Sequence, residues 1–294
     1  MASNPRLQQM RMNAQSLSQL SQLTHSPARG VRNTLLVPPL KLAYVRHSGK
    51  VGGLELERAY FFKTLCSHFF PNEAHKEWWF PDVFLPHGCL ARLHRRNLLR
   101  THYRSDLRSS ALSDYTFVLF MRDPCSRAVS SFLWGLPSFG RTARAQSALS
   151  LEEFVHNPKL IEHRGRPHPS WHWQSQLEGI VYSNLPRIDL VGCVHSLSVD
   201  FNTVIEHLNS RQEVRNGTLM KLPTLLSSES GSKSTGGDRR PTNAARNGTA
   251  KGELLRRMHT TSLCPNDVCH GYYSLDCKLS PCWEARYGED KGMR

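Results

Sequence analysis

Short runs of consecutive apolar residues alternate along the chain with stretches whose apolar residues recur every three or four positions. The runs at residues 40–45, 114–121 and 187–194 predict buried strands, because each is short and bounded by turn or polar residues. Residues 54–70 and 198–208 predict helices with one apolar face. Strands that alternate with helices are typical of an α/β fold, so we expect a central parallel sheet flanked by helices.

Weaker patterns lie between these elements. The first long helix is expected to end at Pro71, and "DVFLPHGC" at 82–89 predicts a short strand running into a turn. Residues 91–108 are strongly basic, with Leu93, Leu98 and Leu99 as the apolar anchors. A further helical region is expected around residues 171–182.

The composition of the chain divides it into four segments. Residues 1–38 are rich in Gln, Ser and Arg and predict a disordered leader or a weak organelle-targeting segment, and not a secretory signal. Residues 39–210 form the expected core, and residues 211–252, rich in Gly, Ser and charge, predict a disordered low-complexity insertion. Residues 253–294 are a Cys-rich segment expected to pack on the core. No apolar run approaches the roughly 18 residues of a membrane span, so no anchor is visible.

Charge and cysteine usage indicate the kind of partner and the cellular compartment. The chain has 38 Lys and Arg residues against 24 Asp and Glu, a formal net charge of +14 that favours anionic partners. The spacing of the last four of the eight cysteines allows a zinc site but fits two disulfides in an oxidising lumen better. Sequons at Asn216 and Asn247 agree with a secretory compartment. The last four cysteines of the chain are Cys264, Cys269, Cys277 and Cys282.

A glycine-flanked lysine follows the first predicted strand. The stretch "SGKVGG" at 48–53 would allow a tight turn that approaches an anion, with Lys50 as a mobile positive charge. It is not the loop of magnesium-dependent nucleotide hydrolases, because Val51 replaces the required Ser or Thr and no glycine stands five residues before Gly49. The loop alone is equally compatible with an ordinary turn that exposes a lysine.

A second candidate site follows the strand at 114–121. Arg122 leaves the strand, Asp123 is a favourable N-cap, and Pro124 suits the first position of a helix that runs to about residue 134. Ser130 projects from the second turn of this helix. An arginine fork and a hydroxyl at a helix start suit a terminal phosphate. Arg127 either assists or is a solvated surface residue.

These motifs resemble those of sulfotransferases that use 3′-phosphoadenosine 5′-phosphosulfate (PAPS). The stretch "RDPCSRAVSSF" at 122–132 resembles the family's 3′-phosphate motif, and the lysine loop resembles its 5′-phosphosulfate loop. The stretch at 174–208 and "GYYSLD" at 271–276 are similar to segments of the Golgi carbohydrate sulfotransferases. The resemblance covers about residues 40–210 and the tail from about 255.

The resemblance implies a P-loop-like sulfotransferase fold and transfer of a sulfuryl group from PAPS to a carbohydrate or glycan hydroxyl, with no metal. It implies Lys50 and His87 as catalytic residues, with His87 as the general base. It also implies a location in the Golgi lumen or membrane and no nucleic-acid partner. The acceptor would be a glycan, and an acidic glycan would suit the basic stretch at 91–108. The implied PAPS-binding residues are Lys50, Val51, Gly52, Gly53, Arg122 and Ser130.

Several positions depart from the family pattern. Gly49 replaces a usual proline, Leu54 and Glu55 replace hydroxyl residues that would bind the phosphosulfate, and His195 replaces an acid. A glutamate there would repel the phosphosulfate. The alternative is therefore a catalytically decayed sulfotransferase-like protein that binds anionic glycan. A nucleotide kinase is disfavoured by Val51.

Overall fold

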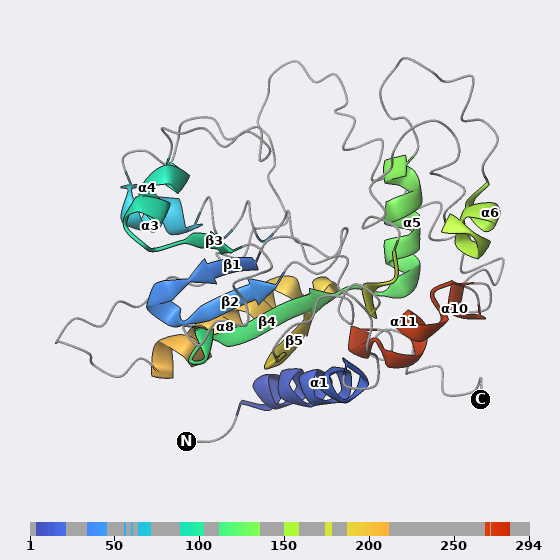
Figure 1. The fold of residues 1–294 in the computed structure, drawn as a ribbon, viewed down its shortest axis with the longest axis horizontal. Helices are drawn as coiled ribbons and strands as arrows, with labels where there is room; N and C mark the ends of the chain where they lie inside the picture. Colours follow the sequence, from blue (N-terminus) through green and yellow to red (C-terminus); the bar gives the residue numbers. More distant parts are fainter. Residues whose placement is uncertain are drawn as a thin grey trace, which may run out of the picture. The chain divides into compact units, whose positions relative to one another are not determined.

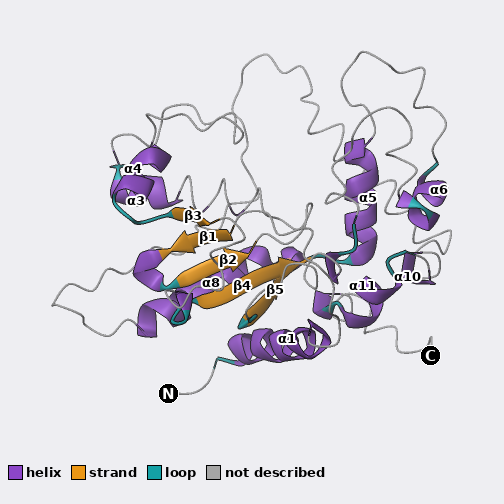
Figure 2. Cartoon of the chain, in the orientation of Figure 1, coloured by secondary structure: helices purple, strands orange, loops and turns teal. Residues whose placement is uncertain are grey.

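A computed structural model describes residues 4–21, 34–45, 56, 60, 64–71, 89–102, 112–135, 150–158, 174–177, 187–211, 268–270 and 272–282 (Figures 1 and 2). The chain forms two compact units. The first contains the sheet with α1, α3, α4 and α8, and the second contains α5, α6, α10 and α11. The two units are described in turn.

The first unit is built on a five-stranded sheet in the order β3-β1-β2-β4-β5 (Figure 2). Strands β2, β4 and β5 are parallel, at the three places where the apolar runs predict strands. Strand β1 is antiparallel to both β2 and β3, so the sheet is mixed and not wholly parallel as predicted. The strands are β1 (Thr34–Val37), β2 (Leu42–Val45), β3 (Arg100–His102), β4 (Thr116–Met121) and β5 (Leu190–Cys193).

Helix α8 (Leu197–Arg211) supplies much of the core beside this sheet. Side chains alternate between the two faces of a strand, which places Val118 and Phe120 of β4 on one face. Both belong to the same buried cluster as Phe201 of α8. The apolar stripe predicted for this helix is buried and consists of Phe201, Val204, Ile205 and Leu208.

Helix α1 (Pro5–Ser21) and strand β1 correct the prediction that residues 1–38 are a disordered leader. Leu7, Met10, Ala14 and Leu17 recur at helical spacing and are all buried. The helix contacts β5 and α8, and the Asn13 Nδ2 donates to the Val191 carbonyl of β5 across 3.4 Å. Figure 1 shows α1 beside β5, which is the last strand in the order of the described sheet. Among the described elements, this helix therefore lies at the β5 edge of the sheet.

Two short helices, α3 (Leu65–Phe69) and α4 (Cys89–Arg95), are joined by a disulfide between Cys66 and Cys89. Cys89, predicted in a turn after a short strand, begins α4 instead, and residues 82–88 lie outside the described residues. Most of the helix predicted at 54–70 also lies outside them, although Leu56, Tyr60 and Leu65 are buried in the main core. Leu93, Leu98 and Leu99 are buried, which confirms them as the anchors of the basic stretch. A 3-10 turn, η1 (Pro38–Leu40), leads into β2.

The second unit has its own apolar core. Helix α5 (Pro124–Gly135) packs with α6 (Leu151–His156), α10 (Val268–His270) and α11 (Ser274–Leu279). A Ser150–Glu153 capping box begins α6. The described part of the Cys-rich segment thus packs on α5, and a disulfide between Cys269 and Cys277 joins α10 to α11. This bond agrees with the preference for disulfides over zinc in the segment.

Neither a membrane-spanning helix nor a metal-binding cluster is present among the described residues. No described helix is long and apolar enough to cross a membrane. No group of three or more His, Cys, Asp or Glu side chains within the described ranges could hold a metal ion. The insertion predicted at 211–252 lies outside the described residues except for Arg211, which ends α8.

Candidate functional site

The described part of the predicted site lies at the start of α5, in the second unit. Asp123 is buried, and its Oδ1 accepts a hydrogen bond of 2.6 Å from the Ser126 N–H. Its carbonyl accepts from the Arg127 N–H at 2.9 Å. Pro124 is the first residue of α5 and has no N–H that would need a partner. The predicted N-cap and helix start are therefore confirmed.

Arg122 lies between the end of the strand and this cap, and its backbone is held on both sides by one side chain. Gln176 Oε1 accepts from the Arg122 N–H at 2.8 Å, and Gln176 Nε2 donates to the Arg122 carbonyl at 2.7 Å. A primary amide carries both a donor and an acceptor, so it can pair with a peptide as a neighbouring strand does. The Arg122 side chain is partly exposed.

The Gln176 segment is held in turn by Asp276 of α11. Its Oδ1 accepts from the Ser175 hydroxyl at 2.7 Å and from the Leu177 N–H at 3.0 Å. Its Oδ2 accepts from the Gln176 N–H at 2.9 Å. The Asp276 side chain is fully buried, so the three donors offset the cost of removing its oxygens from water.

Arg127 and Ser130, the two polar candidates of the motif on α5, differ in how far they are exposed to solvent. Arg127 is fully buried, so it is not the solvated surface arginine that the sequence allows as one interpretation. Ser130 is partly exposed, whereas both of its neighbours, Val129 and Ser131, are buried. Of the two, Ser130 is the residue whose side chain a ligand could reach.

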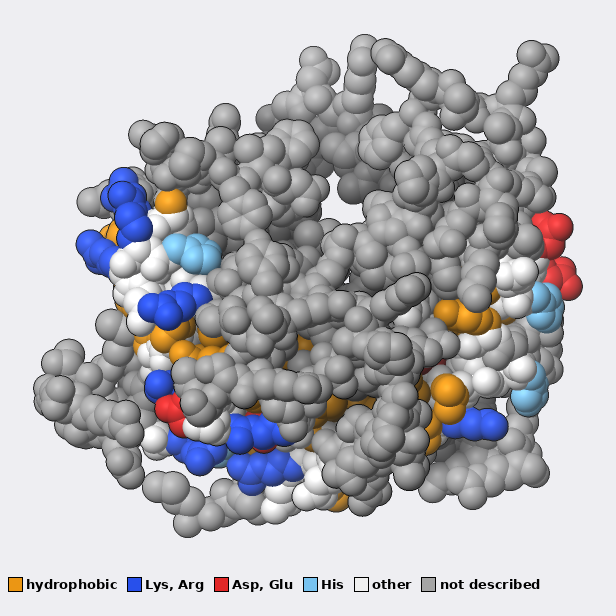
Figure 3. All heavy atoms as spheres, in the orientation of Figure 1, with side chains coloured by type: hydrophobic (Ala, Val, Ile, Leu, Met, Phe, Trp, Pro, Cys, Tyr) orange, Lys and Arg blue, Asp and Glu red, His pale blue; other side chains and the backbone are white. Residues whose placement is uncertain are grey.

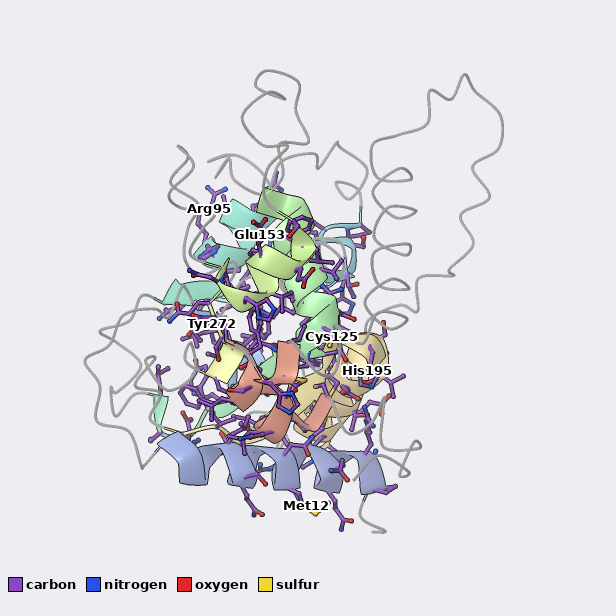
Figure 4. The ribbon with its side chains drawn as sticks, turned by 90° about the vertical axis from the view of Figure 1, so that its right-hand side faces the viewer. Met12, Arg95, Cys125, Glu153, His195 and Tyr272 are labelled. Carbon is purple, nitrogen blue, oxygen red and sulfur yellow. A yellow bond between two sulfur atoms is a disulfide. The ribbon has the colours of Figure 1, made fainter. Side chains whose placement is uncertain are left out.

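The other predicted site residues fall outside the described part of the chain. They are Lys50, Val51, Gly52, Gly53 and His87, together with the departures at Leu54 and Glu55. Of the departures, His195 is described: it is exposed on η8 (Val194–Ser196) of the first unit (Figure 4). Arg122 and Ser130 are therefore the described members of the predicted PAPS site.

Sequence reasoning missed Gln176 and Asp276 as parts of this site. Each stands in a stretch that carries the family resemblance, at 174–208 and 271–276 respectively. No local spacing could have paired them, because Gln176 lies 54 positions from Arg122 and Asp276 lies 100 positions from Gln176. Only the folded chain brings them to the arginine.

A second feature is the basic surface of α4 and β3 in the first unit. The guanidinium groups of Arg92 and Arg96 lie 5.7 and 4.9 Å from the centre of the Phe70 ring. Arg95, Arg96 and Arg100 are exposed, and Figure 3 shows blue side chains gathered over α4. Burial lowers the pKa of His94 on the same helix, so its ring resists taking up a further positive charge.

Comparisons with protein-family models, with curated proteins and with solved structures give no significant match for this chain.

Proposed function

We propose that the protein is a PAPS-dependent sulfotransferase acting on a hydroxyl of a carbohydrate or glycan. The observation that carries the proposal is the anchored arginine: Gln176 holds Arg122 by its backbone immediately before the capped N-terminus of α5. The N-terminus of a helix favours an anion, and an arginine fork beside it matches a phosphate. The motif resemblance makes that anion the 3′-phosphate of the nucleotide.

The described residues fit a terminal phosphate in charge and in access. Arg122 and Ser130 both keep part of their surface open, whereas Asp123 is occupied at the cap by the Ser126 N–H. In this proposal Arg122 binds phosphate oxygens through its guanidinium, and Ser130 donates its hydroxyl to the same group. Both bonds are charge-assisted and therefore stronger than bonds between neutral groups.

The reaction would be an in-line transfer. The acceptor hydroxyl oxygen attacks sulfur, the bond from sulfur to the bridging phosphate oxygen breaks, and adenosine 3′,5′-bisphosphate leaves. The hydroxyl proton passes to His87, the proposed general base. General base catalysis of this kind accelerates a reaction by roughly 10² to 10⁴. Lys50 would neutralise the charge that develops on the leaving phosphate, and Val51, Gly52 and Gly53 would line the same loop. The family resemblance also makes the Golgi the proposed compartment.

Calorimetric titration of adenosine 3′,5′-bisphosphate into the full chain tests this proposal. We expect micromolar binding that is at least tenfold weaker in Arg122→Ala. Arg187→Ala is the control, because it removes an exposed arginine that belongs to the first unit and not to the proposed site. Absence of binding by the folded wild-type chain would refute the enzyme proposal.

A second candidate function is binding of an anionic glycan without catalysis. The observation that favours it is the basic surface of α4 and β3, where Arg92 and Arg96 lie over Phe70 and Arg95 and Arg100 are exposed. A heparin column separates the candidates. Retention lost in Arg95→Ala/Arg96→Ala, together with no nucleotide binding by the wild type, would favour the binding protein.

A further inference from the structure

A chain of buried hydrogen bonds connects the C-terminal segment to the residue that we place on the phosphate. Asp276 accepts three hydrogen bonds from the 175–177 segment, and Gln176 from that segment makes two bonds to the Arg122 backbone. Asp276 and Gln176 are both fully buried. The described contacts thus run from α11 through one glutamine to the arginine.

The three bonds to Asp276 leave the backbone of Gln176 little freedom. Both carboxylate oxygens are used, and two of the donors are the consecutive N–H groups of Gln176 and Leu177. A fixed backbone with a fully buried side chain restricts the amide to one direction. The Gln176 amide is therefore presented to Arg122 already oriented, before any ligand binds.

Arg122 needs such support because of its position. It follows Met121, the last residue of β4 to pair with β5, and it precedes the Asp123 cap. Its N–H and carbonyl thus lie beyond the paired strand residues, and Gln176 supplies the partner for both. Without Gln176, Arg122 would lose the fixed backbone from which its guanidinium extends.

We propose that Asp276 and Gln176 are positioning residues for nucleotide binding, acting through the Arg122 backbone. This inference rests on the proposed function. It makes α11, held to α10 by the Cys269–Cys277 disulfide, part of the nucleotide-binding machinery although neither residue touches the ligand. Preorganised binding groups gain affinity because less freedom is lost when the ligand arrives.

The experiment uses Asp276→Asn in the full chain. The new amide group cannot accept as both carboxylate oxygens do, so one bond to the 175–177 segment is lost. We expect adenosine 3′,5′-bisphosphate to bind at least tenfold more weakly by calorimetry, which corresponds to about 1.4 kcal/mol. The Arg122 amide, measured by hydrogen exchange, should exchange faster although residue 276 does not touch it.

Asp200→Asn is the matched control. Asp200 is also buried and also accepts from a backbone N–H, that of Cys193, but it belongs to the first unit. It should lower stability while leaving the nucleotide affinity and the Arg122 amide unchanged. Should Asp276→Asn fail to fold, Gln176→Met, which removes both bonds to Arg122 and keeps most of the side-chain volume, takes its place.

A double-mutant cycle separates positioning from a general structural role. If Asp276 acts through Arg122, then Asp276→Asn weakens binding in the wild-type chain but adds nothing in the Arg122→Ala background. Equal losses in both backgrounds, or wild-type affinity in both Asp276→Asn and Gln176→Met, would overturn the inference and leave the proposed function intact. A folded wild type that binds no nucleotide refutes the proposed function itself.

Discussion

Arg6 of α1 and Asp200 of α8 form an ion pair across 194 positions of sequence. Arg6 Nε lies 2.6 Å from Asp200 Oδ1, and the carboxylate side chain is only 1% exposed. Asp200 Oδ2 accepts from the Cys193 N–H at 2.8 Å and from the Ser196 hydroxyl at 2.9 Å. The pair therefore ties the N-terminal helix to the turn between β5 and α8.

Removal of this arginine should destabilise the first unit. In Arg6→Ala the buried carboxylate keeps two partners and loses its cation, so we expect a loss of about 1 to 2 kcal/mol in the free energy of unfolding. The arginine side chain is 38% exposed, which keeps the loss below that of a fully buried pair. Urea denaturation measures it. Gln15→Ala, at an exposed position of the same helix, is the control and should change stability by less than about 0.5 kcal/mol.

Gly192 of β5 should tolerate no side chain. A Cβ placed there would lie 2.5 Å from Phe120 Cε1 and 3.1 Å from Asp200 Oδ2, and the phenyl ring is fully buried. We expect Gly192→Ala to cost about 1 to 3 kcal/mol of stability. The double variant Gly192→Ala/Phe120→Leu should lose less than the sum of the two single losses, because the smaller side chain makes room. Additive losses would contradict this explanation.

The elements that sequence patterns could predict are those whose signal is local. The Asp123-Pro124 start of α5 needs only neighbouring residues, and the strand at 116–121 is a continuous apolar run. Helix α1 was not predicted because its segment is rich in Gln and Ser. Its buried face includes Met10 and Ala14 and contains few strongly apolar residues. Its residues are nevertheless good helix formers, and burial against β5 and α8 provides the rest.

The pairing of strands and of buried polar groups could not be predicted in the same way. Nothing local to Thr34–Val37 shows that β1 lies between β2 and β3 and runs antiparallel to both. The bonds of Asp276 to the 175–177 segment are likewise contacts between distant segments, which a single sequence leaves undetermined. The motif could therefore indicate Arg122 and Ser130 but not the residues that hold Arg122.

The two disulfides should contribute unequally to stability. The bond between Cys66 and Cys89 spans 23 positions and that between Cys269 and Cys277 spans 8. The loop-closure model assigns them about 3.5 and about 2.5 kcal/mol respectively. We therefore expect Cys66→Ala/Cys89→Ala to lower the free energy of unfolding more than Cys269→Ala/Cys277→Ala. Thermal unfolding under oxidising conditions compares them, and the reverse order would contradict the expectation.

The contact between α1 and α8 should weaken in acid. Arg11 Nη2 lies 3.3 Å from His207 Nε2, and burial, followed by the charges of Arg11 and Arg211, lowers the pKa of His207. The unfolded histidine, with a pKa of about 6.5, takes up its proton first as the pH falls. The contribution of neutral His207 to stability is therefore fully present above about pH 6.5 and decreases as the pH falls below it.

The variant His207→Gln should flatten this part of the curve of stability against pH. Glutamine can still accept a hydrogen bond from Arg11 but does not titrate. His94, whose pKa burial also lowers, contributes with the same sign, so His94→Gln in parallel separates the two contributions. Urea midpoints between pH 5 and 7.5 give the curves, and an unchanged slope in His207→Gln would contradict this assignment.

Ser130 and Ser131 are adjacent on α5, yet their substitution should have opposite consequences. Ser130 is partly exposed and is the proposed donor to the 3′-phosphate, whereas Ser131 is fully buried. Loss of a hydrogen bond to a charged group costs about 1.5 to 3 kcal/mol, so Ser130→Ala should weaken binding of adenosine 3′,5′-bisphosphate by at least tenfold. Its melting temperature should stay near that of the wild type, because the hydroxyl is not part of the core. Ser131→Ala should instead lower the melting temperature and leave the affinity unchanged. Calorimetry and thermal unfolding on both variants measure this contrast, and equal affinity losses would remove Ser130 from the proposed site.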